Sequence, residues 1–150
     1  ASFGLKIVNG ELEIWSQYGP SELLKHASYL TRLTLAHHPH PRKAGFAEID
    51  FRMNEIASNV LNWHMDDVEI PDTVISAVSD KHPTLFATGV NIGLRPLVGK
   101  GSRNVTERIA DSLSIYRPNP LEVALFNGET IHTRPSEDLK DRVFARTVIS

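Results

Sequence analysis

The chain has 150 residues, seven histidines, no cysteine and a formal net charge of −2. This length suits one domain with a sizeable hydrophobic core. The charge excludes a general attraction to nucleic acid or anionic membranes, and the lack of cysteine excludes disulfides and thiolate chemistry. No apolar run approaches the about 20 residues of a membrane span, and the first residues lack a secretory-signal pattern. We expect a single cytoplasmic domain over residues 1–150, without a nucleic-acid or membrane partner.

The first third of the chain predicts a hairpin followed by a helix. Apolar and polar residues alternate on both sides of Asn9 and Gly10, a strong two-residue turn signal, so residues 5–15 should form two paired strands. Ser21 is then expected to cap a helix that extends to about residue 36. Four apolar residues at helical spacing would form its buried face: Leu23, Ala27, Leu30 and Leu33.

The rest of the chain predicts many short strands. The expected strands cover residues 47–53, 59–64, 73–78, 84–90, 113–116, 122–126, 130–133 and 142–149. A glycine-rich turn at 99–102 and a short helix at about 104–112 interrupt the series. One helix followed by short strands at even spacing is typical of a sandwich or barrel-like β fold. The pattern alone therefore predicts a mainly β, α+β domain.

Three residues of metal-ligating type lie on the predicted strands. His64 and Asp66 are two residues apart, so an extended strand turns both side chains to one face. His132 would have to come from a strand that faces the first. Two imidazoles and one carboxylate leave the opposite side of an ion open, as suits non-haem Fe(II) and oxygen chemistry. A His-x-Asp pair without such context is more often a surface or capping pair.

Two arginines near the end of the chain are candidate anion-binding residues. Arg142 and Arg146 are four residues apart, so on a strand they share a face with Phe144. Two guanidiniums that face an interior are costly unless anions meet them, and a carboxylate is the usual partner. The alternative partners are protein carboxylates: Asp138 or Asp141 for Arg142, and Glu122 or Asp50 for Arg146.

His64-x-Asp66, then His132 after Phe-Asn-Gly-Glu-Thr-Ile, then Arg142 ten residues on, resembles the ordered pattern of the Fe(II)/2-oxoglutarate-dependent oxygenases. The resemblance covers about residue 59 to the C-terminus. It implies a double-stranded β-helix, or jelly roll, with the N-terminal helix packed outside one sheet. It also implies that His64, Asp66 and His132 bind Fe(II), and that Arg142 binds the far carboxylate of 2-oxoglutarate. The implied reaction consumes O2 and usually hydroxylates the substrate.

Three further residues are expected in the same pocket. Thr84 resembles a family position on the strand after the first ligands, and Asn62 lies two residues before His64, on its face. Both would line the 2-oxoglutarate pocket. Arg146 could bind an anionic group of a small or carrier-bound substrate. The alternative function is a jelly-roll protein that uses no oxygen, either a cupin-like metal isomerase or lyase, or a binding or structural module.

Overall fold

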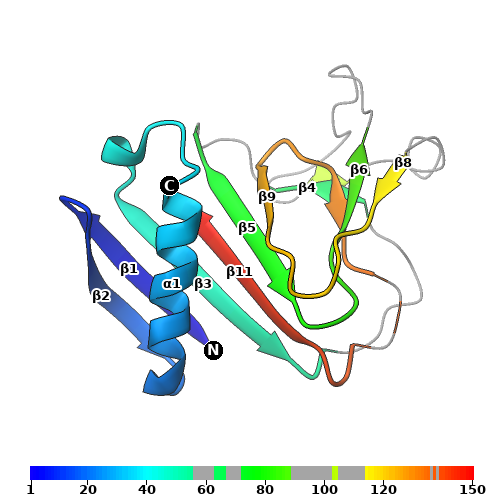
Figure 1. Cartoon of the computed structure of the whole chain (residues 1–150), viewed down its shortest axis with the longest axis horizontal. Coiled ribbons are helices and arrows are strands. Elements are labelled where there is room, and N and C mark those ends of the chain that lie inside the picture. The colour runs from blue at the N-terminus through cyan, green and yellow to red at the C-terminus, as the bar shows by residue number, and fades with distance from the viewer. Residues whose placement is uncertain (56–62, 67–71, 89–102, 105–113, 136, 138) are drawn as a thin grey trace.

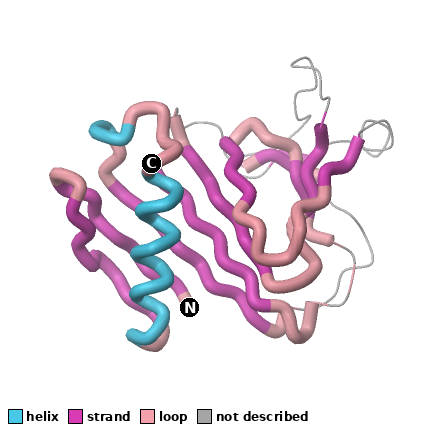
Figure 2. Tube along the Cα trace, in the orientation of Figure 1, coloured by secondary structure: helices cyan, strands magenta, loops and turns pink. Residues whose placement is uncertain are grey.

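The structure is a computed structural model that describes residues 1–55, 63–66, 72–88, 103–104, 114–135, 137 and 139–150. Over these residues the protein is mainly β, with two antiparallel sheets and one α-helix, α1 (Leu24–Leu35) (Figures 1 and 2). Short 3-10 turns at Ser21–Leu23 and Pro41–Lys43 flank the helix. In this described part, no helix is long and apolar enough to cross a membrane.

The predicted N-terminal hairpin is confirmed. β1 (Ser2–Val8) pairs antiparallel with β2 (Glu11–Tyr18). Asn9 and Gly10, which join them, have positive φ angles of 51° and 79°. A type I′ hairpin turn needs positive φ at both of its central residues, and asparagine and glycine tolerate that conformation best. The two turn residues therefore set the register of the hairpin.

The predicted helix is confirmed, but its predicted cap is wrong. The chain enters α1 through a 3-10 turn, so Ser21 lies three residues before the helix begins, and neither the turn nor the helix has a side-chain cap. Ser21 instead accepts a hydrogen bond of 2.9 Å from Gln17. Thr31 and Thr34 are fully buried on the helix. Burial of their hydroxyls is tolerated because each donates a hydrogen bond to a carbonyl one turn earlier.

The larger sheet carries the hydrophobic core. Its six strands lie in the order β2, β1, β3 (Phe46–Met53), β11 (Val143–Ile149), β5 (Val74–Ser79) and β9 (Ala124–Asn127). In Figure 1, α1 crosses the sheet in front of its central strands, and it contacts β3, β11 and β5. The helix-side core consists of Phe3, Leu5, Ile7, Ala27, Ala44, Ala47, Ile49 and Ile149.

The smaller sheet holds the predicted ligand strands. Its five strands lie in the order β7 (Arg103–Asn104), β4 (His64–Met65), β10 (His132–Thr133), β6 (Leu85–Thr88) and β8 (Ser114–Tyr116). Of the expected strand at 59–64, the structure describes residues 63 and 64 and places only His64 in a strand; the expected strand at 84–90 begins one residue later, at Leu85, over its described part. The turn at 99–102 and residues 105–112 of the expected helix lie outside the described residues, as does Asn62.

Eight of the nine described strands from β3 to β11 pair from the outside of the sequence inward; the ninth, β7, pairs with β4. β3 pairs with β11 and β5 with β9 in the larger sheet, whereas β4 pairs with β10 and β6 with β8 in the smaller one. Successive pairs thus alternate between the two sheets, an arrangement compatible with a β-sandwich. The alternation lets side chains of the C-terminal strand β11 meet those that follow β4.

Candidate metal centre

The two candidate histidine ligands lie side by side in one sheet. His64 of β4 is directly opposite His132 of β10, and their ring centroids are 4.4 Å apart. The prediction that His132 comes from a facing strand is therefore wrong, because it lies on the neighbouring strand. Residues directly opposite in an antiparallel pair have Cβ atoms roughly 5 Å apart, whereas packed sheets are about 10 Å apart. Strand pairing brings the imidazoles closer than sheet packing would.

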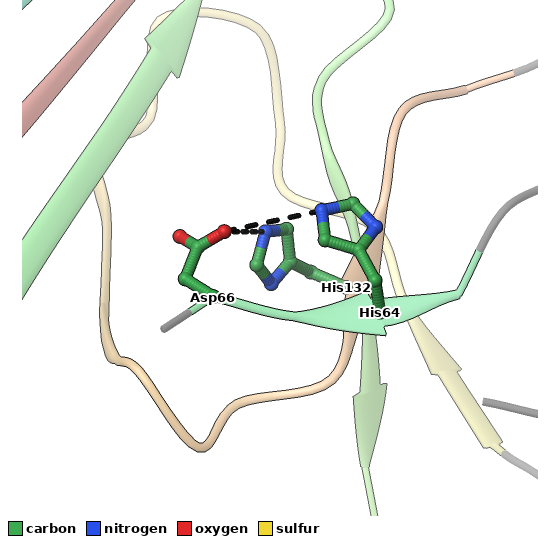
Figure 3. A group of neighbouring side chains, drawn as sticks. All are labelled: His64, Asp66 and His132. Carbon is green, nitrogen blue, oxygen red and sulfur yellow. Dashed lines mark ion pairs between the residues drawn. The ribbon is translucent and has the colours of Figure 1, made fainter. Parts of the chain in front are cut away.

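Asp66 completes the group from the end of β4. Its Oδ1 atom lies 3.5 Å from Nε2 of His132 and 4.0 Å from Nε2 of His64, and both rings point toward it (Figure 3). One ligand atom from each residue lies within 4.8 Å of the others. Ligands about 2.1 Å from a common ion lie roughly 3–3.5 Å apart, so a small approach suffices. Over the described residues, no other cluster of three such side chains meets this criterion.

The ring of His132 is oriented by a backbone carbonyl. Its Nδ1 lies 2.9 Å from the carbonyl oxygen of Thr130, which can only accept a hydrogen bond. Nδ1 therefore carries a proton, and Nε2 faces Asp66 either as the proton donor of an imidazolium or with the lone pair of the neutral ring. A lone pair that faces a carboxylate oxygen is repelled unless a proton or a cation lies between them. Histidine ligands of metals typically donate their other nitrogen in this way.

Asp66 is held as a carboxylate by its neighbours. Burial raises the pKa of this carboxyl. The hydrogen bond with His132 and the charges of Arg146, His132 and His64 together lower the pKa by more than burial raises it, so that it is about 2 instead of 3.8. Arg146 donates from Nη2 to Oδ2 of Asp66 over 2.8 Å. Asp66 is therefore charged throughout the physiological range, as a metal ligand must be. The donor set fits a divalent transition metal such as Fe(II).

Arg142 is buried and paired with a protein carboxylate. Its Nη2 donates to Oε2 of Glu55 over 2.8 Å, and its Nη1 donates to the carbonyl oxygen of His82 over 2.7 Å. Its Nε is buried and has no hydrogen-bond partner among the described residues. The partner is thus Glu55, not Asp141, and Asp138 lies outside the described residues. Likewise the partner of Arg146 is Asp66, not Glu122 or Asp50.

A cavity of about 100 Å³ joins the metal centre to both arginines. It is large enough for several water molecules but small beside the roughly 300–1,000 Å³ of typical ligand pockets. Its positively charged side chains outnumber its carboxylates by four to two, which favours an anionic ligand. The lining residues are Arg52, Glu55, His64, Asp66, Ala77, Thr84, Phe126, His132, Arg134, Arg142, Phe144 and Arg146.

The cavity contains six of the seven predicted site residues, and Asn62 lies outside the described residues. Thr84 lines it from just before β6, and Phe144 lies on the same face as the two arginines, as the spacing predicted. Three charged residues were missed. Arg134 follows His132 by two residues, so the alternation that selected Asp66 would have found it. Glu55 and Arg52 carry no comparable signal.

No protein-family model matches the chain, and comparison with curated proteins gives no significant match. The functional assignment therefore depends on the site itself.

Proposed function

We propose that this protein is an Fe(II)- and 2-oxoglutarate-dependent dioxygenase with a jelly-roll fold. The observation that carries the proposal is the approach of His64, Asp66 and His132, two imidazoles and a carboxylate on one side of a common point. The outside-in pairing of eight strands, alternating between two sheets, supports the jelly roll. We further propose a cytoplasmic protein that acts on a small or carrier-bound substrate.

Each ligand residue has a distinct part in this proposal. His64 and His132 would bind the ion through Nε2, and Asp66 through Oδ1, which leaves the other side of the ion open. When bound, iron and 2-oxoglutarate would supply oxygen activation, in which 2-oxoglutarate, O2 and the substrate yield succinate, CO2 and the hydroxylated substrate. Phe126 and Phe86 pack near His132, with ring centroids 4.9 and 6.2 Å away. These rings give the site an apolar surface beside His132.

Arg142 and Thr84 are the proposed co-substrate contacts. Arg142 lines the same cavity as the ligands, and its guanidinium stacks 4.7 Å from the centroid of Phe144. A guanidinium binds a carboxylate strongly because it can donate two parallel charge-assisted hydrogen bonds to it. The Thr84 hydroxyl is buried at the cavity wall, where it could donate to the same carboxylate. Binding there requires that Glu55 move or share the guanidinium.

The pairing of Arg142 with Glu55 also favours a second candidate function. Because a protein carboxylate already meets this arginine, the metal centre could work without 2-oxoglutarate. A cupin-like isomerase or lyase would use the ion to polarise a substrate oxygen. The two candidates share the metal ligands and differ in whether 2-oxoglutarate binds.

Anaerobic titration separates the candidates. Fe(II) is added to the protein first and 2-oxoglutarate second, while the weak visible charge-transfer band of a chelated complex is followed. The dioxygenase proposal expects the band with wild type and its loss in His132→Ala and Asp66→Ala. His37→Ala, at an exposed histidine outside the cavity, is the matched control. Metal binding without this band, and without succinate formation once O2 is admitted, would favour the second candidate.

A further inference from the structure

An ion pair joins the C-terminal strand of one sheet to the candidate metal centre of the other. Arg146 lies in β11, and Asp66, 80 residues earlier in sequence, directly follows β4. Across from Arg146 on β5 is Ala77, and both residues line the cavity. Ala77 therefore adds only a methyl group to the cavity wall beside Arg146.

The two oxygens of Asp66 have different partners. Oδ1 is the atom nearest both imidazoles, at 3.5 and 4.0 Å, whereas Oδ2 accepts the 2.8 Å hydrogen bond from Arg146. While this bond holds Oδ2 toward Arg146, Oδ1 is the oxygen that the carboxylate turns toward the two imidazoles. If both oxygens bound, the carboxylate would occupy a further coordination position.

We propose that Arg146 is a positioning residue of the metal centre, which holds Asp66 so that it binds an ion through Oδ1 alone. This arrangement keeps open a coordination position that a bidentate carboxylate would fill. The inference rests on the metal-binding part of the proposed function and is independent of 2-oxoglutarate. It gives Arg146 a part distinct from the substrate contact expected from the sequence.

Two effects of Arg146 on metal affinity oppose each other. Its positive charge repels a divalent cation, whereas its hydrogen bond orders the ligand before the ion arrives. β4 is only two residues long, so the strand ladder contributes little to the position of Asp66. Ordering should therefore dominate. Loss of such an outer contact typically weakens metal binding about 10–100-fold.

The test measures Zn(II) and Co(II) affinity by calorimetry with the full chain, independently of turnover. Arg146→Ala should bind both ions about 10–100-fold more weakly. Arg146→Lys should restore most of the affinity, since it keeps a charged donor, and Arg146→Gln should restore part. Arg117→Ala is the matched control, because Arg117 donates to Glu137 over the same 2.8 Å but lies outside the cavity.

Co(II) absorption gives a second readout that general loss of packing would not reproduce. Arg146→Ala should show a weaker visible band, as expected for a higher coordination number once Asp66 binds through both oxygens, and Arg146→Lys should resemble wild type. Unchanged or tighter metal binding with an unchanged spectrum in Arg146→Ala would overturn the inference. If that variant does not fold, equal affinity and equal spectra in Arg146→Gln and wild type overturn it instead.

The outcomes for the two proposals are distinguishable. Wild type that binds Co(II) but not 2-oxoglutarate would remove the dioxygenase proposal and leave the role of Arg146 intact. If wild type binds both Co(II) and 2-oxoglutarate but the Arg146 variants keep the wild-type metal affinity and spectrum, the role of Arg146 is overturned and the dioxygenase proposal stands. Wild type that binds no divalent transition metal would overturn both.

Discussion

Arg142 and Glu55, 87 residues apart in sequence, form a buried ion pair of 2.8 Å in the wall of the candidate metal cavity. Their side chains are only 2% and 13% exposed. A guanidinium removed from water to this extent needs an anion, and removing one member of such a pair is costly. Glu55 therefore supplies, from the protein itself, the carboxylate that the resemblance assigns to 2-oxoglutarate at Arg142.

The first prediction is that Glu55→Gln binds 2-oxoglutarate more tightly. Glutamine keeps the shape and a hydrogen-bond acceptor but removes the competing charge. The expected gain is about tenfold in Kd, equivalent to about 1.4 kcal/mol. The measurement is the anaerobic titration at saturating Fe(II). Glu137→Gln, which alters the exposed pair with Arg117, should leave the Kd unchanged. Weaker binding in Glu55→Gln would mean that Glu55 supports the pocket and does not compete for it.

The second prediction concerns Arg142 itself. Arg142→Ala should weaken 2-oxoglutarate binding by about 1.5–3 kcal/mol, the range for hydrogen bonds to charged groups. The 2-oxoglutarate affinity of Arg142→Lys should lie between those of Arg142→Ala and wild type, since lysine keeps the positive charge but not the two parallel donors of the guanidinium. Succinate formation in the absence of substrate measures the effect, with Arg117→Ala as the control. Wild-type affinity in both variants would remove Arg142 from the site.

The same assay also checks the identity of the anion-binding arginine. Arg146 variants are measured at metal concentrations high enough to saturate their weakened sites. Under these conditions they should keep their 2-oxoglutarate affinity, because Arg146 contacts Asp66. If Arg146 variants lose affinity for 2-oxoglutarate and Arg142 variants do not, the two arginines have exchanged the proposed parts.

The third prediction is a pH dependence of the metal-free protein. The pKa of Asp66 is about 2 in the folded state against an ordinary 3.8. A lowered carboxyl pKa stabilises the fold above the unfolded value, and this contribution is lost as pH falls from about 4 toward 2. The shift corresponds to about 2.5 kcal/mol at most, and partial solvent access reduces it to about 1–2 kcal/mol.

Chemical denaturation of metal-free wild type and Asp66→Asn measures this contribution. The difference in their free energies of unfolding should shrink as pH falls below about 4. Asp141→Asn, at an exposed carboxyl in the turn before β11, serves as the control. A difference that stays constant down to pH 2.5 would show that the native contacts of Asp66 do not lower its pKa.

Local patterns in the sequence predicted the elements that carry the site. Asn9 and Gly10 determine the hairpin turn by their backbone preferences, and the two-residue spacing of His64 and Asp66 places both on one side of β4. These features depend only on neighbouring residues. The predicted cap of α1 is wrong although it also depends only on neighbouring residues. A serine before an apolar helical pattern does not distinguish the start of an α-helix from the 3-10 turn that Ser21 begins.

Relationships between distant strands could not be read in the same way. Whether His132 lies on the strand next to His64 or in the facing sheet depends on which strands become neighbours. The order of strands in a sheet cannot be predicted from local sequence patterns. The partner of Arg142 is a glutamate 87 residues away, and every carboxylate in the chain carries the same local signal. Asp138 and Asp141 are near Arg142 in sequence, but the buried guanidinium pairs with Glu55, the carboxylate that lines the same cavity.

The last prediction separates stability of the fold from function of the site. Ile49 of β3 is fully buried in the helix-side core, across the larger sheet from the cavity. Ile49→Ala should lower the free energy of unfolding by about 2–5 kcal/mol, the typical cost of such a core truncation. Co(II) affinity of the folded fraction should stay at the wild-type value, because none of the cavity-lining side chains is changed.

Ile14→Ala, at a 55% exposed isoleucine of β2, is the matched control and should change stability by less than about 0.5 kcal/mol. Urea denaturation and calorimetry at a temperature where both variants are folded make the comparison. A parallel loss of metal affinity in Ile49→Ala would mean that packing under α1 controls the position of β11, and with it the contact between Arg146 and Asp66.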